Sequence, residues 1–589
     1  MTFSRFKAAA FLVVFPVSAA SVHCVGRRAK PPSRSITISV PYQIETLDPH
    51  ASGSAGGLSI AANLYEPLVA TDATLRPRPA LATAWENPDP LTWIFHLRRD
   101  VRFHSGRPLR ARDVAYSIAR LRSGGPFELA PYADDVAEVE TPDAYTVRLR
   151  TREPVTILLA KLQYVFIVPD GASSDDLARG EDGTGPYRLG QWIRGSRLTM
   201  GAFGDYWGRR PDVERVTFRL DRTPEQAAAD FLSGGSQLAQ GQAGKVEEAL
   251  SRAAGARVER RSSLFVSFLA FDASSDIAQF CSARPNPFLQ AGVRKAVDLA
   301  LDRRRLGFDS PAGPRPATQC IPPSIFGFDP TISNPPRDPE AARRLLASAG
   351  YPDGFRVTLH TRSMFADMAR AVARMLGEAG IGVEVRVLDD PDFWALSGAT
   401  LILDRFACQT GDASEAFEQL IHTSDPRRHL GASNRGRYSN RDLDALIERS
   451  AGELDLTRRN SMLRDIMRAV AEERPIVPVG IADDVYAIRD IYRWEPREDG
   501  DIRAAEIELA PRGAAGRGRP GSDRAPASHP PAARAGARAA EAQGSAGAVF
   551  PLGGRREVPK AKLRKARHSF WVFSTGANFA YVVWRPYHE

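Results

Sequence analysis

Several features that would define a function class are scarce or absent in this 589-residue sequence. Cysteine occurs four times, and no two cysteines have the CxxC spacing of a metal site. No G-x-S-x-G, HExxH or P-loop motif is present. After the first 25 residues, no apolar run approaches the roughly 20 residues that span a bilayer. The sequence therefore excludes a polytopic membrane protein, and we expect no catalytic residue, cofactor or metal ligand.

An excess of one charge is also absent from most of the chain. The whole sequence carries a net charge of +9. Residues 512–589 contain fourteen Lys and Arg but four Asp and Glu, a net of +10, so residues 1–511 carry −1. A neutral body lacks the basic surface that binds phosphates, and we expect no nucleic-acid partner. Residues 512–549 are rich in Ala, Gly, Pro and Arg, so we interpret 512–589 as a low-complexity basic tail.

The N-terminus has the layout of a secretory signal peptide. Arg5 and Lys7 precede an apolar run, and small residues follow to position 20. We expect cleavage after residue 19 or 20 and a periplasmic or otherwise extracytoplasmic location. Cys24 suggests a lipoprotein site, but His23 stands where a small residue is needed, so a lipid anchor is not favoured. Export permits a disulfide among the four cysteines, yet buried thiols are the favoured interpretation.

Mixed helix and strand patterns follow one another along the rest of the chain. Period-two alternation predicts a strand at 35–40, another strand is expected at 92–97, and a long apolar β run covers 264–271. Asp338, Pro339 and Gly350 predict the cap, first residue and end of a helix. A further helix is expected at 456–473, followed by a strand at 476–479 that a proline interrupts. No repeat of 20–50 residues is present, which argues against a solenoid.

Two histidines, His96 and His104, lie eight residues apart. They are candidates for a metal pair, but no third ligand is nearby, so a structural role for both is favoured. The aromatic residues Trp85, Trp93 and Phe95 are expected in the core rather than at a ligand.

A series of short motifs then appears in a fixed order. They are LYEPL at 64–68, GTGPY at 183–187, YW at 206–207, VRKA at 293–296 and AGYPDGF at 349–355. Over residues 35–511 this order resembles the family 5 extracellular solute-binding proteins of ABC importers, the peptide- and nickel-binding group. Each motif alone is weak, and their shared order carries the resemblance. The tail after residue 511 is not part of it.

The resemblance implies an α/β fold with two lobes, the periplasmic-binding-protein fold of the large peptide-binding type with an extra subdomain in the first lobe. Crossing strands would join the lobes, and closure around the ligand would be the working motion. The expected divisions are a signal peptide at 1–20, lobe I at 35–60, 186–266 and 487–511, an inserted subdomain at 61–185, lobe II at 267–486, and the tail at 512–589.

The implied function is that of the extracytoplasmic substrate-binding component of an ABC importer. Such a protein would capture peptides between its lobes, as a monomer, and deliver them to a permease in the inner membrane. Nickel or another small solute is the alternative ligand within this class. A secreted hydrolase and a transcriptional regulator are the alternatives from other classes, but no hydrolase motif is present and a signal peptide stands where DNA-binding helices would lie.

The resemblance also indicates candidate ligand-binding residues in the segment 408–414. Peptide-binding relatives often carry a Trp-x-x-Asp element here, whose Asp meets the amino terminus of the peptide. Asp412 matches that Asp, while Gln409 stands where Trp is usual. An equally weighted alternative is that Asp412 caps the following helix.

Two further segments are candidates for the ligand site. The small residues of 52–58, with Ser54 and Leu58, would leave room for a ligand, although a plain flexible loop is equally plausible. Trp394, next to Phe393, would offer an aromatic wall, although core packing of both is the favoured alternative.

Overall fold

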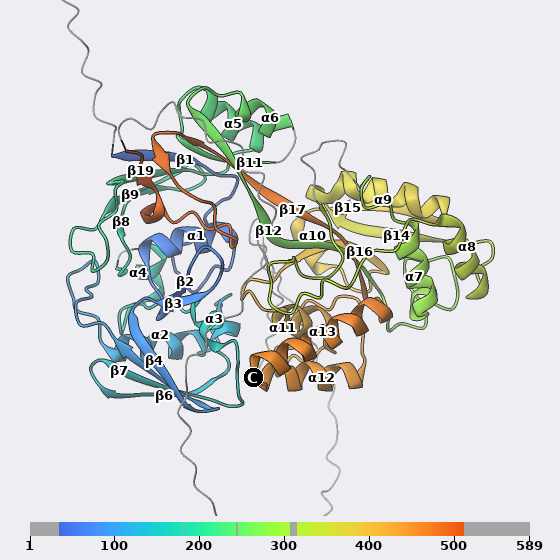
Figure 1. The fold of residues 1–589 in the computed structure, drawn as a ribbon, viewed down its shortest axis with the longest axis horizontal. Helices are drawn as coiled ribbons and strands as arrows, with labels where there is room; N and C mark the ends of the chain where they lie inside the picture. Colours follow the sequence, from blue (N-terminus) through green and yellow to red (C-terminus); the bar gives the residue numbers. More distant parts are fainter. Residues whose placement is uncertain (1–33, 181, 243–244, 307–314, 512–589) are drawn as a thin grey trace, which may run out of the picture. The chain divides into compact units, whose positions relative to one another are not determined.

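The computed structural model describes residues 34–180, 182–242, 245–306 and 315–511, and Figure 1 shows their arrangement. The predicted signal peptide, Cys24 and the basic tail lie outside these residues. In the described part of the chain, no helix combines the length and apolarity needed to cross a membrane.

One large sheet organises the described residues. Its neighbouring strands follow the order β15–β14–β16–β12–β17–β11–β1–β10–β9–β8, and β13 pairs with β17. Both parallel and antiparallel pairs occur, for example β1 with β10 and β9 with β10. The strands of this sheet are β1 (Ser35–Ser39), β8 (Tyr187–Ile193), β9 (Arg197–Ala202), β10 (Arg215–Arg219), β11 (Leu238–Gln242), β12 (Ala256–Phe271), β13 (Arg315–Pro316), β14 (Phe355–Arg362), β15 (Ile381–Leu388), β16 (Leu401–Ala407) and β17 (Ile476–Arg489).

Three smaller sheets accompany it. A four-stranded antiparallel sheet has the order β4–β5–β7–β6, and two short pairs are β2–β3 and β18–β19. Their strands are β2 (Val69–Thr71), β3 (Pro77–Pro79), β4 (Ala82–Asp89), β5 (Thr92–Leu97), β6 (Val136–Asp143), β7 (Thr146–Thr151), β18 (Tyr492–Arg493) and β19 (Glu508–Leu509).

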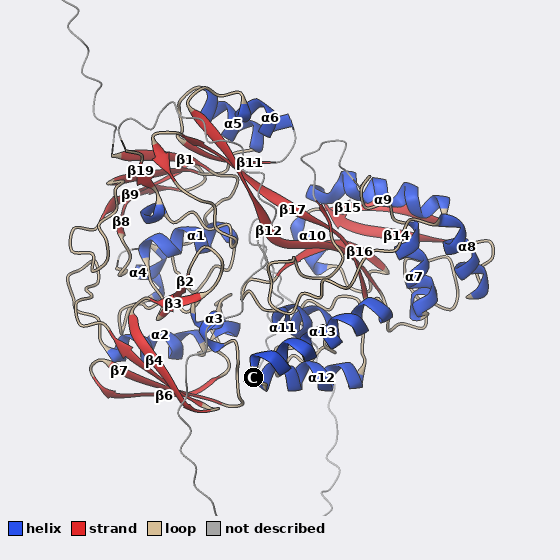
Figure 2. Cartoon of the chain, in the orientation of Figure 1, coloured by secondary structure: helices blue, strands red, loops and turns tan. Residues whose placement is uncertain are grey.

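The helices flank the sheets, as Figure 2 shows. Helices α7, α8 and α9 pack together beside the strands β14 and β15. The helices are α1 (Ala55–Leu64), α2 (Ala111–Leu121), α3 (Leu158–Leu162), α4 (Ser174–Ala178), α5 (Pro224–Leu232), α6 (Lys245–Ser251), α7 (Ala291–Ala300), α8 (Pro339–Ser348), α9 (Ala366–Glu378), α10 (Asp390–Ala395), α11 (Ala413–Ala416), α12 (Arg441–Gly452) and α13 (Leu456–Glu473). A π-helical turn, Phe417–Ile421, continues α11.

The buried apolar side chains form separate cores. One core draws on residues between 36 and 238 and between 486 and 507. Two others draw almost entirely on residues between 264 and 479. We refer to residues 34–255 and 490–511 as the first half, and to residues 272–475 as the second half. The residue boundaries expected for the lobes and the subdomain stay a prediction.

The two longest strands, β12 and β17, connect the halves. They pair with each other from Ala256–Arg489 at one end to Ala270–Ile476 at the other. The C-terminal part of β17, residues 484–488, also pairs with β11. The C-terminal part of β12, residues 265–271, also pairs with β16. The register between the two strands breaks after Ser262–Asp483 and resumes at Val266–Ile481. A second shift lies between Ser267–Gly480 and Phe268–Pro478. Breaks in the ladder bend and twist strands locally, so the crossing segment has two defined places to flex.

Several sequence predictions are confirmed at this level. The predicted strand at 92–97 is β5, and the predicted helix at 456–473 is α13. The Oδ1 of Asp338 accepts from the backbone N of Ala341 at 2.7 Å, Pro339 begins α8, and Gly350 has φ +93°. Trp93 and Phe95 are buried. In the described residues, Cys281, Cys320 and Cys408 are buried free thiols, as favoured.

Candidate functional site

The segment after β16 contains the first two predicted site residues. Gly411 has φ +75°, a left-handed conformation that glycine adopts without strain, and the chain turns there into α11. Asp412 is the N-cap of α11, and its Oδ1 accepts a hydrogen bond from the backbone N of Ser414 at 3.0 Å. The helix-cap interpretation of Asp412 is therefore confirmed.

The carboxylate of Asp412 also has a charged partner within the chain. Both terminal nitrogens of Arg459 contact it, Nη2 to Oδ1 at 2.9 Å and Nη1 to Oδ2. Arg459 is 1% exposed, and its Nε donates to the carbonyl of Ser450 at 3.0 Å. The expected contact of Asp412 with the amino terminus of a peptide stays a prediction, and that ammonium would have to share the carboxylate with Arg459.

Gln409 lies where the two halves meet. The hydroxyl of Tyr132 donates to its Oε1 at 3.3 Å, and the hydroxyl of Tyr164 donates to its backbone carbonyl at 3.1 Å. The two tyrosine rings, both from the first half, pack with their centroids 4.5 Å apart. A planar amide in this position can bond to polar groups, which the tryptophan usual in relatives would do less well.

The segment 52–58 forms the start of α1. Ser54 is the N-cap, and its Oγ accepts from the backbone N of Gly57 at 3.1 Å. Leu58 is buried in the first core. A Cβ on Gly56 would lie 2.4 Å from the ring of Tyr42. The small residues therefore permit close packing of α1, while contact of Ser54 and Leu58 with a ligand stays a prediction.

Trp394 is half-buried beside two arginines. Phe393 is fully buried, which confirms the core-packing interpretation for that residue. The guanidinium carbons of Arg362 and Arg435 lie 5.3 and 5.4 Å from the centroid of the Trp394 ring. Arg362 also donates to Asp404 at 2.7 Å. The role of Trp394 in ligand binding stays a prediction.

Two charged residues near the crossing strands were not among the predicted site residues. Arg405 of β16 and Asp484 of β17 are both half-buried. Burial, and then the neighbouring Arg362, lowers the pKa of Arg405 to about 10, although Asp404 and Asp484 oppose the change. Burial raises the pKa of Asp484 to about 6, although Arg405 opposes the change. The two opposite charges therefore interact across strands that are far apart in the sequence.

An acidic group from the end of the described chain lies close to Asp484. A Cβ on Gly500 would be 3.6 Å from Oδ2 of Asp484. Burial and then Asp499 raise the pKa of Asp501 to about 7. Asp499 itself accepts from Arg497 Nη2 at 2.7 Å. No sequence motif marks this group, because its members come together only through the fold.

The two histidines have different surroundings. His104 is buried, its Nε2 is 2.9 Å from the carbonyl of Gly185, and its Nδ1 accepts from the backbone N of Gly183 at 3.3 Å. It therefore holds the GTGPY turn in place. His96 is exposed, and its Nε2 lies 2.9 Å from Glu86. Among the residues that the structure describes, no cluster of three or more His, Cys, Asp or Glu side chains could hold a metal ion.

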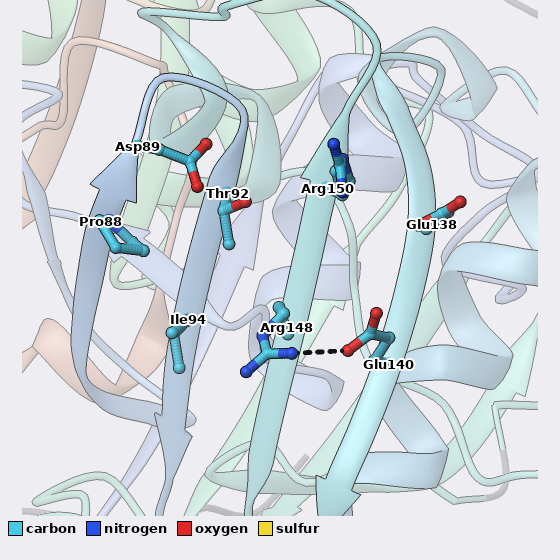
Figure 3. Close-up of a pocket in the computed structure, with 8 residues that line it drawn as sticks. All are labelled: Pro88, Asp89, Thr92, Ile94, Glu138, Glu140, Arg148 and Arg150. Carbon is cyan, nitrogen blue, oxygen red and sulfur yellow. Dashed lines mark hydrogen bonds and ion pairs between the residues drawn. The ribbon is translucent and has the colours of Figure 1, made fainter.

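A hollow on the four-stranded sheet contains none of the predicted site residues (Figure 3). Arg148 on β7 pairs with Glu140 on β6 at 2.9 Å, and both side chains are exposed. Exposed pairs of this kind contribute little to stability. The hollow is lined by Pro88, Asp89, Thr92, Ile94, Glu138, Glu140, Arg148 and Arg150.

Comparison with known proteins adds a family and a fold. The model of bacterial extracellular solute-binding proteins, family 5 middle region, matches residues 76–425. The glutathione-binding protein GsiB of Salmonella choleraesuis is 25% identical over 469 residues, which cover 76% of this chain and 89% of the relative.

Solved structures have the same two-lobed fold. The periplasmic binding protein DppA from Helicobacter pylori, in complex with the peptide STSA, has a TM-score of 0.70 at 20% identity, with 81% of this chain and 98% of that chain covered. NikA from Staphylococcus aureus, in complex with Ni(L-His)2, has a TM-score of 0.66 at 19% identity, with 81% and 100% covered.

Proposed function

Because the chain belongs to the bacterial extracellular solute-binding proteins of family 5, we propose that it binds a short peptide, or another small zwitterion built from amino acids, between its two halves. It acts as a monomer outside the inner membrane and delivers the solute, chemically unchanged, to an ABC permease. The proposal commits to binding and transport rather than to an enzymatic reaction.

The observation that carries this proposal is the pair of opposite charges at the crossing strands. Arg405 and Asp484 are each partly exposed to solvent, although burial is the largest cause of the pKa shift of each. That combination is expected of groups that face an enclosed space rather than bulk water. A solute with a carboxylate and an ammonium would bring its carboxylate to Arg405 and its ammonium to Asp484, so that each charge of the solute meets an opposite charge when water is excluded.

The named ligands of the relatives support the same chemistry. GsiB is named for glutathione, DppA was solved with a peptide, and NikA was solved with nickel held by histidine. All three ligands are built from amino acids and carry carboxylates. The contact of Gln409 with both Tyr132 and Tyr164 supports a site where the halves meet.

Native mass spectrometry of the protein purified from its source tests the ligand class directly. We expect a mixture of short peptides, roughly two to eight residues long, because an enclosed site limits length. A single non-peptide species released on unfolding would contradict the peptide assignment.

Calorimetry with trialanine and its C-terminal amide tests the charge complementarity. If Arg405 meets the carboxylate, Arg405→Met should weaken trialanine binding by about 2–5 kcal/mol and leave the amide unaffected. Arg197→Met, an exposed arginine on β9, is the matched control. Equal losses for both peptides would place the carboxylate elsewhere.

A further inference from the structure

The two halves meet at a second place, away from the crossing strands. The backbone N and Oγ of Thr156 lie 3.3 and 3.1 Å from the carbonyl of Ala451, and its Oγ also donates to the carbonyl of Glu453 at 2.9 Å. Figure 1 shows α3 of the first half next to α11 of the second. We call the following residues the closing contact: Asp134, Asp135, Thr156 and Lys161 from the first half, and Glu415, Glu418, His429 and Ala451 from the second.

Lys161, on α3, is the ammonium group of the closing contact. Its side chain is 16% exposed, and its Nζ lies 2.7 Å from Oδ2 of Asp135. Burial on its own lowers the pKa of Lys161, but the carboxylates of Glu418, Asp135 and Glu415 outweigh burial and raise it. Two of these three carboxylates belong to the second half. Lys161 is therefore stabilised by charges that reach it only when the halves are together.

The acids of the second half are held close to this ammonium. Oε2 of Glu415 accepts from the backbone N and the Oγ1 of Thr410 at 2.8 and 2.9 Å. Burial raises the pKa of Glu415 to about 7, with Thr410 and Lys161 opposing the change. Burial also raises the pKa of Glu418, with Lys161 opposing. These carboxylates lie in surroundings that penalise their charge, and Lys161 reduces the penalty.

The remaining charged groups at the contact do not replace Lys161. His429 pairs with Asp134, and that carboxylate, together with Asp135, raises its pKa, while burial and Arg152 oppose. Arg459 is paired with Asp412, and it opposes the rise in the pKa of Glu418 less strongly than Lys161 does. The charge of Glu415 also contributes to the raised pKa of two neutral groups, the Tyr164 hydroxyl and the Cys408 thiol.

From this arrangement we propose that Lys161 is an electrostatic latch, which holds the two halves together by neutralising Glu415 and Glu418 across the closing contact. The inference rests on the proposed function, in which the halves close on a solute. A group that favours the closed arrangement raises ligand affinity without touching the ligand, because only the closed arrangement completes the site. Lys161 is thus a positioning residue for binding.

Closure can be measured without any ligand. Spin labels on Thr141→Cys in β6 and Arg441→Cys in α12, both exposed, report the distance between the halves. We expect Lys161→Met to move the distance distribution of the unliganded protein toward longer values, whereas Lys295→Met, on the exposed surface of α7, leaves it unchanged. Identical distributions for Lys161→Met and wild type would overturn the latch.

A double variant separates the latch from a local effect inside the first half. Glu418→Gln removes one of the carboxylates that Lys161 neutralises. Lys161→Met combined with Glu418→Gln should recover much of the closed population that Lys161→Met loses, because fewer charges are left uncompensated. No recovery would mean that Lys161 acts only through Asp135, and the proposal would be wrong.

The pH profile gives a further readout. When the halves separate, Glu415 contacts water and its pKa falls toward the usual value near 4.5, so closure takes up protons. The defect of Lys161→Met should therefore be largest near pH 8 and shrink toward pH 5, where Glu415 is protonated in the closed arrangement. A defect independent of pH would contradict the latch.

Binding of trialanine by calorimetry distinguishes the latch from the function itself. We expect about tenfold weaker binding for Lys161→Met at pH 8 and no change for Lys295→Met, a size typical of coupling within one charge network. If wild type binds no peptide, the peptide assignment fails while the spin-label result still decides the latch. A shift in distance with unchanged affinity would overturn the proposed link to binding.

Discussion

Glu66, in the LYEPL element, is a buried carboxylate whose ionisation should govern stability near neutral pH. Its Oε1 accepts from the hydroxyl of Tyr206 at 2.8 Å and its Oε2 from Nε1 of Trp207 at 2.9 Å. Burial raises its pKa from 4.5 to about 7, although the hydrogen bonds from Trp207 and Tyr206 oppose the change. Each carboxylate oxygen therefore has a hydrogen-bond donor, but the site stabilises the negative charge less than water does.

The sign of the pH effect follows from proton binding. The folded protein binds the Glu66 proton more tightly than the unfolded chain, so stability falls as pH rises. The loss begins near the unfolded pKa of 4.5 and is complete above the folded pKa of about 7. At about 1.4 kcal/mol for each tenfold difference in proton affinity, the full loss is about 3 kcal/mol.

Glu66→Gln should remove this loss. The glutamine can accept from Trp207 and donate to the hydroxyl of Tyr206, and it carries no charge at any pH. Urea unfolding at several pH values from 5 to 8 gives the free energy of unfolding for both proteins. We expect the difference between variant and wild type to change by about 2.5 kcal/mol in favour of the variant over that range, because a small part of the loss has already occurred at pH 5. Glu140→Gln, at an exposed pair, is the control and should show no such trend. A constant difference for Glu66→Gln would refute the reasoning.

Two further substitutions test the site and the fold. If the ammonium of the peptide meets Asp412 instead of Asp484, Asp412→Asn should weaken binding of a free-amino peptide by about 2–5 kcal/mol and leave an N-acetylated peptide unaffected in calorimetry; equal affinities for the free-amino peptide would leave Asp412 as a helix cap and the partner of Arg459. Gly183→Ala places a Cβ 1.9 Å from the carbonyl oxygen of Leu64 and should destabilise the protein by about 3 kcal/mol in urea unfolding, whereas Gly201→Ala, with open space around it, should not destabilise it.

Sequence patterns predicted elements that depend on local chemistry. The cap residue Asp338, the proline after it and Gly350 each act within one helix, so the sequence alone is sufficient to place α8. The strand β5 was predicted over its full length, and it alternates buried and less buried residues. The family and the two-lobed fold were also predicted, from the order of the motifs.

The crossing strands were only partly predicted. The expected strand at 264–271 extends back to Ala256, because polar residues such as Arg257 and Arg261 are stabilised by Glu259 and Glu498 rather than by apolar burial. The expected strand at 476–479 continues to Arg489, since the register shift beside Pro478 accommodates the missing N–H group.

The partners of the candidate site residues could not be predicted from the sequence. Arg459 lies 47 positions from Asp412, and Asp484 lies on a different strand from Arg405. Such pairs form only when distant segments are brought together. The sequence therefore indicated the segment around Asp412 as a candidate site, but it did not indicate that Arg459 neutralises the Asp412 carboxylate.

The late position of β17 in the chain has a consequence for how the protein is made. Its last residues pair with β11 and complete the sheet to which β1 belongs, and Trp494, Ile502 and Ile507 fill the same core. A ribosome delivers all of the second half before it delivers these residues. The amino-terminal part therefore stays incomplete, with apolar surface uncovered, until more than 500 residues have emerged. Chaperones that bind nascent or unfolded chains have a long interval in which to act.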